Sequence, residues 1–255
     1  MGSILKRERW IVGGCLAVLV FAAWAYLVYE RVSMPADMDM PGMVMLDLRE
    51  WSAVDLGLLF VMWSAMMVAM MVPSAAPMLL GFLTVNAGRR ESGRAYVPVW
   101  CFVAGYLAVW IAYSAGATLA QWGLHKAALL STMMESTSPV LNGAMLLAAG
   151  VFQWTSLKHA CLTSCRSPLA FLMSEWRSGA QGAFVMGVRH GAYCLGCCWI
   201  LMALLFVTGV MNLYWVVVIA LFVMAEKTLS KGELFSRVAG VVMALAGVGQ
   251  LVHFW

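Results

Sequence analysis

Seven long apolar runs constrain this chain more than any other feature of its sequence. A helix needs about 20 apolar residues to cross a hydrocarbon layer of about 30 Å, and most of these runs reach that length. Only 11% of the residues are charged, whereas a soluble domain averages about 25%. We therefore predict an all-α, polytopic helical membrane protein with about seven transmembrane helices. The runs cover roughly 10–30, 54–84, 96–120, 139–158, 182–209, 211–226 and 236–254.

The first run could be mistaken for a secretory signal peptide, because three basic residues precede it. It is about 20 residues long, which exceeds the apolar region of a typical signal peptide, and no small-residue cleavage site follows it. We therefore predict a retained first span.

Basic residues between the runs predict the orientation of the chain. With the N-terminus in the cytoplasm, twelve basic residues lie inside and three lie outside, while Arg189 falls within the fifth run. Such a bias follows the positive-inside rule, and we expect a multi-pass protein of the bacterial inner (cytoplasmic) membrane. The inside residues are Lys6, Arg7, Arg9, Arg89, Arg90, Arg94, Lys158, Arg166, Arg177, Lys227, Lys231 and Arg237; the outside ones are Arg31, Arg49 and Lys126.

The chain divides into two parts within one membrane assembly. Residues 1–53 hold the first span and a Met-rich external loop, and residues 54–255 form a six-helix membrane domain. No soluble segment is large enough to fold alone. The partners implied are the lipid bilayer and either membrane partner subunits or further copies of the chain; no feature indicates nucleic acid.

Three thiols and one imidazole lie inside the fifth run, at His190, Cys194, Cys197 and Cys198. Residues three and four apart share one face of an α-helix. Polar groups at membrane depth are costly and usually face a bundle interior or a cavity. We therefore predict a soft-metal or redox site in the core of the bundle.

Two further thiols, Cys161 and Cys165, follow the fourth run as an i, i+4 pair. If the fifth helix rises straight from that side of the membrane, Cys194 to Cys198 lie about 18–24 Å along it. A metal–sulfur bond of about 2.3 Å could not join such distant groups. Either the chain has two sites, or segment 158–182 re-enters the membrane and brings the two thiols to the core.

Methionines add candidate thioether ligands in the second run. Met66, Met67, Met70 and Met71 fall near mid-membrane by helix rise, and Pro73 should kink the helix beside them. Such a stripe is more often adaptable packing than a metal site.

The external loop between the first two runs alternates methionine with aspartate. Thioethers select monovalent copper over zinc, so this loop could capture metal outside, or it could be an interfacial loop lying on lipid. The residues concerned are Met34, Met38, Met40, Met43, Met45, Asp37 and Asp39.

Four other polar residues are candidates for supporting the site rather than binding metal. They are Tyr193, Gln153, Glu226 and Arg189. The pair Glu226-Lys227 ends the sixth run, and an interfacial ion pair is its simplest reading. If Glu226 tilts inward, it could pair with Arg189.

Three functions fit these residues. The leading hypothesis is binding of a soft metal, most simply copper, for handling, transfer or transport. A membrane oxidoreductase is the first alternative, either as a dithiol carrier using Cys194 and Cys197 or as a copper enzyme; the low number of histidines, four in the chain, argues against the enzyme. The second alternative is an accessory subunit in which the cysteines only pack.

Four ordered motifs resemble a bacterial family of predicted metal-binding integral membrane proteins, long classed as a domain of unknown function. The resemblance spans roughly residues 55–245 and implies a polytopic membrane protein with a metal site. The family pattern has glycine where this chain has His190, so His190 could be an added ligand. The motifs are W-x-x-MM-x-AMM-x-P-S at 63–74, Q-x-x-x-x-K-x-x-CL-x-x-CR-x-P at 153–168, G-x-x-H-G-x-Y-C-x-G-CCW-x-LM at 187–202 and EK at 226–227.

Overall fold

The computed structural model describes residues 2–33, 51–94, 96–130 and 136–253. Within these ranges the fold is helical and contains no β-strand, which confirms the predicted all-α class. The helices are α1 (Gly2–Ser33), α2 (Ala53–Glu91), α3 (Val99–Lys126), α4 (Pro139–Phe152), α5 (Ser156–Arg166), α6 (Pro168–Glu175), α7 (Gly179–Ala203), α8 (Leu205–Thr208), α9 (Leu213–Thr228) and α10 (Gly232–His253).

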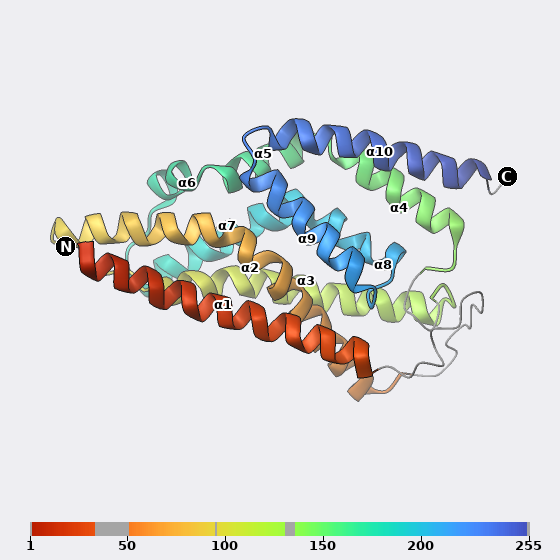
Figure 1. Cartoon of the computed structure of the whole chain (residues 1–255), viewed down its shortest axis with the longest axis horizontal. Coiled ribbons are helices and arrows are strands. Elements are labelled where there is room, and N and C mark those ends of the chain that lie inside the picture. Colours follow the sequence, from red (N-terminus) through yellow and green to blue (C-terminus); the bar gives the residue numbers. More distant parts are fainter. Residues whose placement is uncertain (1, 34–50, 95, 131–135, 254–255) are drawn as a thin grey trace.

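Five helical segments of the described chain are long and apolar enough to cross a membrane. Together α4 and α5 would make a sixth, but they meet at a bend of 62°. With 16 residues, α9 is shorter than a usual transmembrane helix. The expected count of seven is therefore approximate. Figure 1 shows the chain running back and forth between two ends of the molecule.

The long helix α2 begins with a capping box, in which Ser52 and Asp55 satisfy each other's backbone N–H groups. Pro73 and Pro77 lie inside this helix, which nevertheless continues to Glu91. A proline removes one backbone hydrogen bond and bends a helix. In Figure 1, α2 changes direction part-way along its length, as the expected kink requires.

Helices α3 and α7 pack closely because glycines face the opposite backbone. A Cβ atom on Gly187 would overlap the carbonyl oxygen of Phe102, and one on Gly105 would overlap that of Phe184. Close backbone approach through small residues is typical of membrane helix pairs. This packing fixes the position of α7, which carries three of the cysteines.

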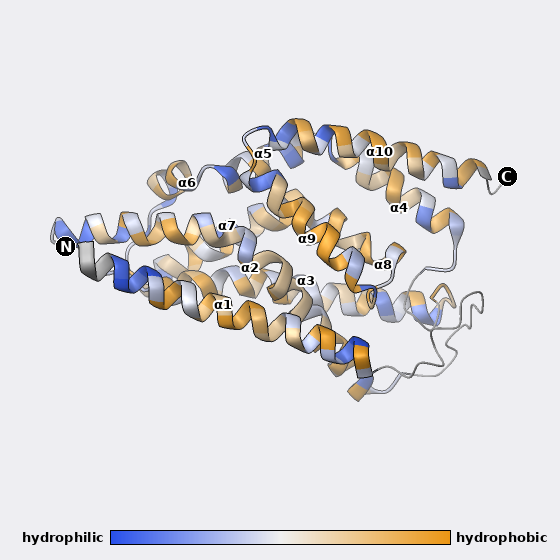
Figure 2. Cartoon of the chain, in the orientation of Figure 1, coloured by the Kyte–Doolittle hydropathy of each residue, from blue (hydrophilic) through white to orange (hydrophobic). Residues whose placement is uncertain are grey.

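The outer helices present apolar side chains to the surroundings. The membrane-length window of α1 is only 17% buried, and so is that of α10. Figure 2 shows long hydrophobic stretches on both helices. A surface this apolar is suited to lipid, so the helices support membrane association.

Candidate metal centre

The bend between α4 and α5 brings five cysteines together. The buried residues of α5 are Lys158, Cys161, Leu162 and Cys165, and this face lies against α7. A Cβ atom on Gly196 would lie 2.7 Å from the Cys161 sulfur, so the absence of a side chain there admits the thiol.

Cys165 of α5 is buried in the same side-chain cluster as Cys194 and Cys197 of α7. All seven cysteines of the chain are free thiols. Of the two arrangements considered from the sequence, the structure contains the one in which the five thiols form a single group. We call Cys161, Cys165, Cys194, Cys197 and Cys198 the thiol cluster.

The three thiols of α7 are almost completely buried. Cys197 and Cys198 both donate to the backbone carbonyl of Cys194, with Sγ···O distances of 3.1 and 2.8 Å. Their side chains therefore turn toward the helix backbone. The Cys194 sulfur points instead toward neighbouring helices.

A lysine ammonium lies against the Cys194 sulfur. Lys227 of α9 donates from Nζ to Cys194 Sγ and to Ser74 Oγ, both at 2.9 Å. These contacts join α9, α7 and α2 at one point. An ammonium supplies the positive charge that a thiolate needs in an apolar interior.

Tyr106 of α3 contacts the same sulfur from another side. Its hydroxyl donates to the carbonyl of Met71 at 3.0 Å and lies 3.2 Å from Cys194 Sγ. Cys194 is therefore contacted by polar groups from two neighbouring helices, and it is the centre of the thiol cluster.

The four candidate methionines of α2 are at most 1% exposed. They belong to the same buried side-chain cluster as all five cysteines. Thioether and thiol sulfur are therefore gathered in one core, as the sequence predicts, although their role as ligands stays a prediction. The methionines are Met66, Met67, Met70 and Met71.

His190 lies one turn before Cys194 and is enclosed by aromatic rings. The ring centroids of Phe102, Tyr106 and Phe171 are 6.0, 5.6 and 5.6 Å from the imidazole. Its Nδ1 atom has no hydrogen-bond partner among the described residues. His190 is thus packed beside the thiol cluster, and ligation by it stays a prediction.

A buried ion pair lies next to the cluster. Lys158 Nζ donates to both carboxylate oxygens of Glu226 at 2.8 Å, and the two side chains are 2% and 1% exposed. Ser236 donates to Gln153 nearby, at 2.8 Å. This pair joins α5 to α9 beside Cys161 and Lys227.

The candidate supporting residues have partners that differ from the simplest expectations. Arg189 pairs with Glu175, whereas Glu226 pairs with Lys158. Tyr193 packs edge-on against Phe171 with centroids 6.1 Å apart. The Met-rich loop predicted to be external, with its methionines and aspartates at 34–45, lies outside the described residues.

Sequence reasoning overlooked the inward positions of Lys158 and Lys227 and the contact from Tyr106. The positive-inside pattern places both lysines at the cytoplasmic side, and no sequence motif singles out Tyr106. A signal was present: Lys158, Cys161 and Cys165 are spaced i, i+3, i+7 and so share one helical face.

No three His, Cys, Asp or Glu side chains in the described part of the chain are arranged to hold one ion as they stand. The thiol and thioether sulfurs gathered there are nevertheless soft donors.

A family model described as PpoB2, copper chaperone, matches residues 60–250. The chain belongs to the PpoB2 family. This match confirms the resemblance to a metal-binding family, and it covers the thiol cluster, the α2 methionines and both buried lysines. Comparisons with curated proteins and with solved structures found no match.

Proposed function

We propose that this PpoB2-family protein binds monovalent copper within the bacterial inner membrane and passes it on. The observation that carries the proposal is the gathering of five thiols and six thioethers, four of them from the candidate methionines of α2, in one buried core. Membership of a family described as copper chaperones supports it. Cys194, Cys197 and Cys198 would be the primary ligands.

The ligand chemistry favours monovalent copper over other metals. Thiolate and thioether sulfur prefer soft ions, whereas carboxylate and carbonyl oxygen prefer hard ones. The Glu226 carboxylate near the cluster is already paired with Lys158. Silver shares the softness of monovalent copper and should bind at the same sulfurs.

The arrangement suggests how the protein handles its cargo. Before copper binds, the Lys227 ammonium supplies positive charge at Cys194. A bound cuprous ion would supply that charge itself, and the thiols of Cys197 and Cys198 would turn away from the Cys194 carbonyl to reach it. Cys161 and Cys165 on α5 would complete the site or act as an acceptor pair for transfer.

Metal content tests the proposal directly. Wild-type protein purified in detergent from copper-supplemented cells should contain bound copper by mass spectrometry, and Cys194→Ser/Cys197→Ser should lose it. The matched control is Cys15→Ser/Cys101→Ser, which removes two thiols outside the cluster and should keep the metal. Copper-free wild type, or equal copper in the cluster variant, would refute the proposal.

A dithiol carrier is the second candidate, because the C-x-x-C pair on α7 lies in the same buried cluster as Cys165 of α5. A reversible disulfide among Cys165, Cys194 and Cys197 is the defining requirement. Thiol trapping in intact cells should detect an oxidised form if the carrier reading is correct. Fully reduced thiols under both oxidising and reducing growth would remove it.

A further inference from the structure

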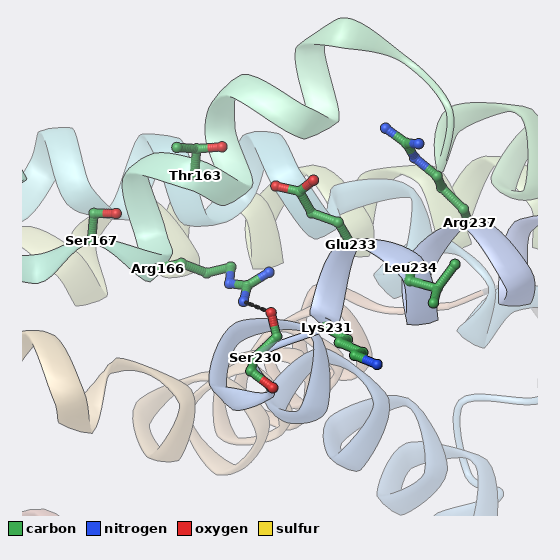
Figure 3. A pocket seen from close by; sticks show the side chains of 8 residues that line it. All are labelled: Thr163, Arg166, Ser167, Ser230, Lys231, Glu233, Leu234 and Arg237. Carbon is green, nitrogen blue, oxygen red and sulfur yellow. Dashed lines mark hydrogen bonds between the residues drawn. The ribbon is translucent and has the colours of Figure 1, made fainter.

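A cavity of about 580 Å³ lies where the end of α5 meets the start of α10. Figure 3 shows side chains from both helices and from the α9–α10 turn arranged around it. None of its lining residues belongs to the thiol cluster. They are Thr163, Arg166, Ser167, Ser230, Lys231, Glu233, Leu234 and Arg237.

The lining of the cavity is basic and rich in hydroxyl groups. The lining includes three cationic side chains, Arg166, Lys231 and Arg237, and one carboxylate, Glu233. The carboxylate is itself 3.5 Å from His159 Nδ1. Guanidinium, ammonium and hydroxyl groups are the donors that bind phosphate in proteins.

One of these cations is held in place by the protein backbone. Arg166 Nη2 donates to the carbonyl oxygens of Leu229 and Ser230, at 2.6 and 3.0 Å. Its Nη1 atom is close to Gly232, where a Cβ atom would lie 3.0 Å away. The guanidinium is therefore pre-positioned at the cavity, which lowers the entropy cost of binding an anion.

An exposed apolar stripe begins at the cavity and follows α10. Its members recur at alternating steps of four and three residues, so they lie on one face of the helix. Leu234, which lines the cavity, is 59% exposed and starts the stripe. The other members are Val238 (56%), Val241 (44%), Leu245 (67%), Val248 (44%) and Val252 (65%).

We propose that this cavity binds the phosphate of an anionic glycerophospholipid whose acyl chains lie along the α10 stripe. Basic pockets between membrane helices on the cytoplasmic side commonly bind such headgroups. The cations of the cavity would bind the phosphate group. The apolar stripe would bind acyl chains, which favours a phospholipid over a free phosphate ion. The site would be in the inner leaflet, where the basic residues are expected. It does not depend on copper binding.

Native mass spectrometry of the full chain in nanodiscs tests this proposal. Wild type should retain phosphatidylglycerol in preference to phosphatidylcholine. Arg166→Gln/Lys231→Gln/Arg237→Gln should weaken retention by about tenfold or more, because it removes the three cations that would contact the phosphate. The matched control Lys6→Gln/Arg7→Gln/Arg94→Gln removes the same charge from exposed positions outside the cavity and should retain the lipid.

Two results would overturn the proposal. Equal retention in the cavity variant and the control would mean that the cavity does not select lipid. Complete displacement of lipid by millimolar inorganic phosphate, with no preference between the two lipids, would mean that the ligand is a soluble anion. Copper content, measured on the same samples, should be unchanged in both variants. Loss of lipid binding and loss of copper binding are therefore distinguished, and each proposal can fail without the other.

Discussion

The buried pair Lys158–Glu226 makes the sharpest stability prediction for single residues. Glu226→Gln leaves the Lys158 ammonium buried without a counter-charge, which should lower the free energy of unfolding by about 3–5 kcal/mol. Lys158→Met/Glu226→Leu removes both charges and should recover most of that loss. Thermal unfolding in detergent gives the comparison.

The exposed pair Arg90–Glu8 provides the control. Its side chains are 58% and 30% exposed and its atoms are 3.7 Å apart. Substitution of Glu8 by glutamine should cost no more than about 1 kcal/mol. If Glu226→Gln costs as little, Lys158 must have another counter-charge or reach water.

Substitution of Tyr106 tests whether its hydroxyl only positions the Cys194 side chain or is needed for copper binding. Tyr106→Phe removes the hydroxyl that donates to the Met71 carbonyl and touches Cys194. Stability should fall by about 1 kcal/mol, while copper content should stay at the wild-type level because every sulfur remains. Tyr113→Phe, which removes a 3.0 Å bond to the Trp199 carbonyl, is the matched control. Copper loss in Tyr106→Phe alone would make the hydroxyl part of the site.

The sequence predicts the identities of the clustered sulfur residues better than the charges around them. Cys194, Cys197 and Cys198 could be placed inside a span because their spacing is helical and local. The direction of Lys227 depends on how α9 packs against α7 and α2, which no local pattern records. A lysine beside a glutamate at the end of an apolar run is equally compatible with an ion pair at the membrane interface and with an inward-pointing lysine.

Among the helices, the contact of α3 with α7 predicts which glycines tolerate a side chain. Gly187→Ala forces a methyl group into the Phe102 carbonyl, and overpacking of this kind costs about 1–3 kcal/mol. Gly116→Ala is the control, because this residue also lies on α3 and no atom outside its own stretch of helix lies within 4 Å of the added carbon. Unfolding in detergent should be easier for Gly187→Ala only.

That same contact should also affect the metal centre. Displacement of α7 would move its three thiols relative to α5, so Gly187→Ala should retain less copper than Gly116→Ala. Equal stability and equal copper in the two variants would mean that α3 and α7 separate easily, contrary to their packing.

At the scale of helices, the apolar runs of the sequence predict the helical content and most of the spans. They do not predict the bend between α4 and α5. The turn Gln153-Trp154-Thr155 contains neither glycine nor proline. Thr155 ends one helix by donating to the Phe152 carbonyl and caps the next by accepting from the Lys158 N–H. Packing of α5 on α7 determines the bend, and the bend determines whether the cysteines form one group or two.

For the whole molecule, the chain's two ends differ in charge. The N-terminus, the α2–α3 turn, the end of α5 and the start of α10 carry the basic residues assigned to the inside. The other end holds few basic residues, among them Lys126. Because positive segments remain in the cytoplasm, the end bearing the cavity between α5 and α10 should face inward.

Thiol labelling tests this orientation. Ser92 and Ala127 are exposed at opposite ends of the bundle, so Ser92→Cys and Ala127→Cys are compared in a Cys15→Ser/Cys101→Ser background. A membrane-impermeant maleimide added to intact spheroplasts should label Ala127→Cys, whereas Ser92→Cys should react only after permeabilisation. The background without a new cysteine measures labelling of the buried thiol cluster and should be low. The reverse pattern would contradict the predicted orientation, because it would place the cavity in the outer leaflet and the loop between the first two helices on the cytoplasmic side.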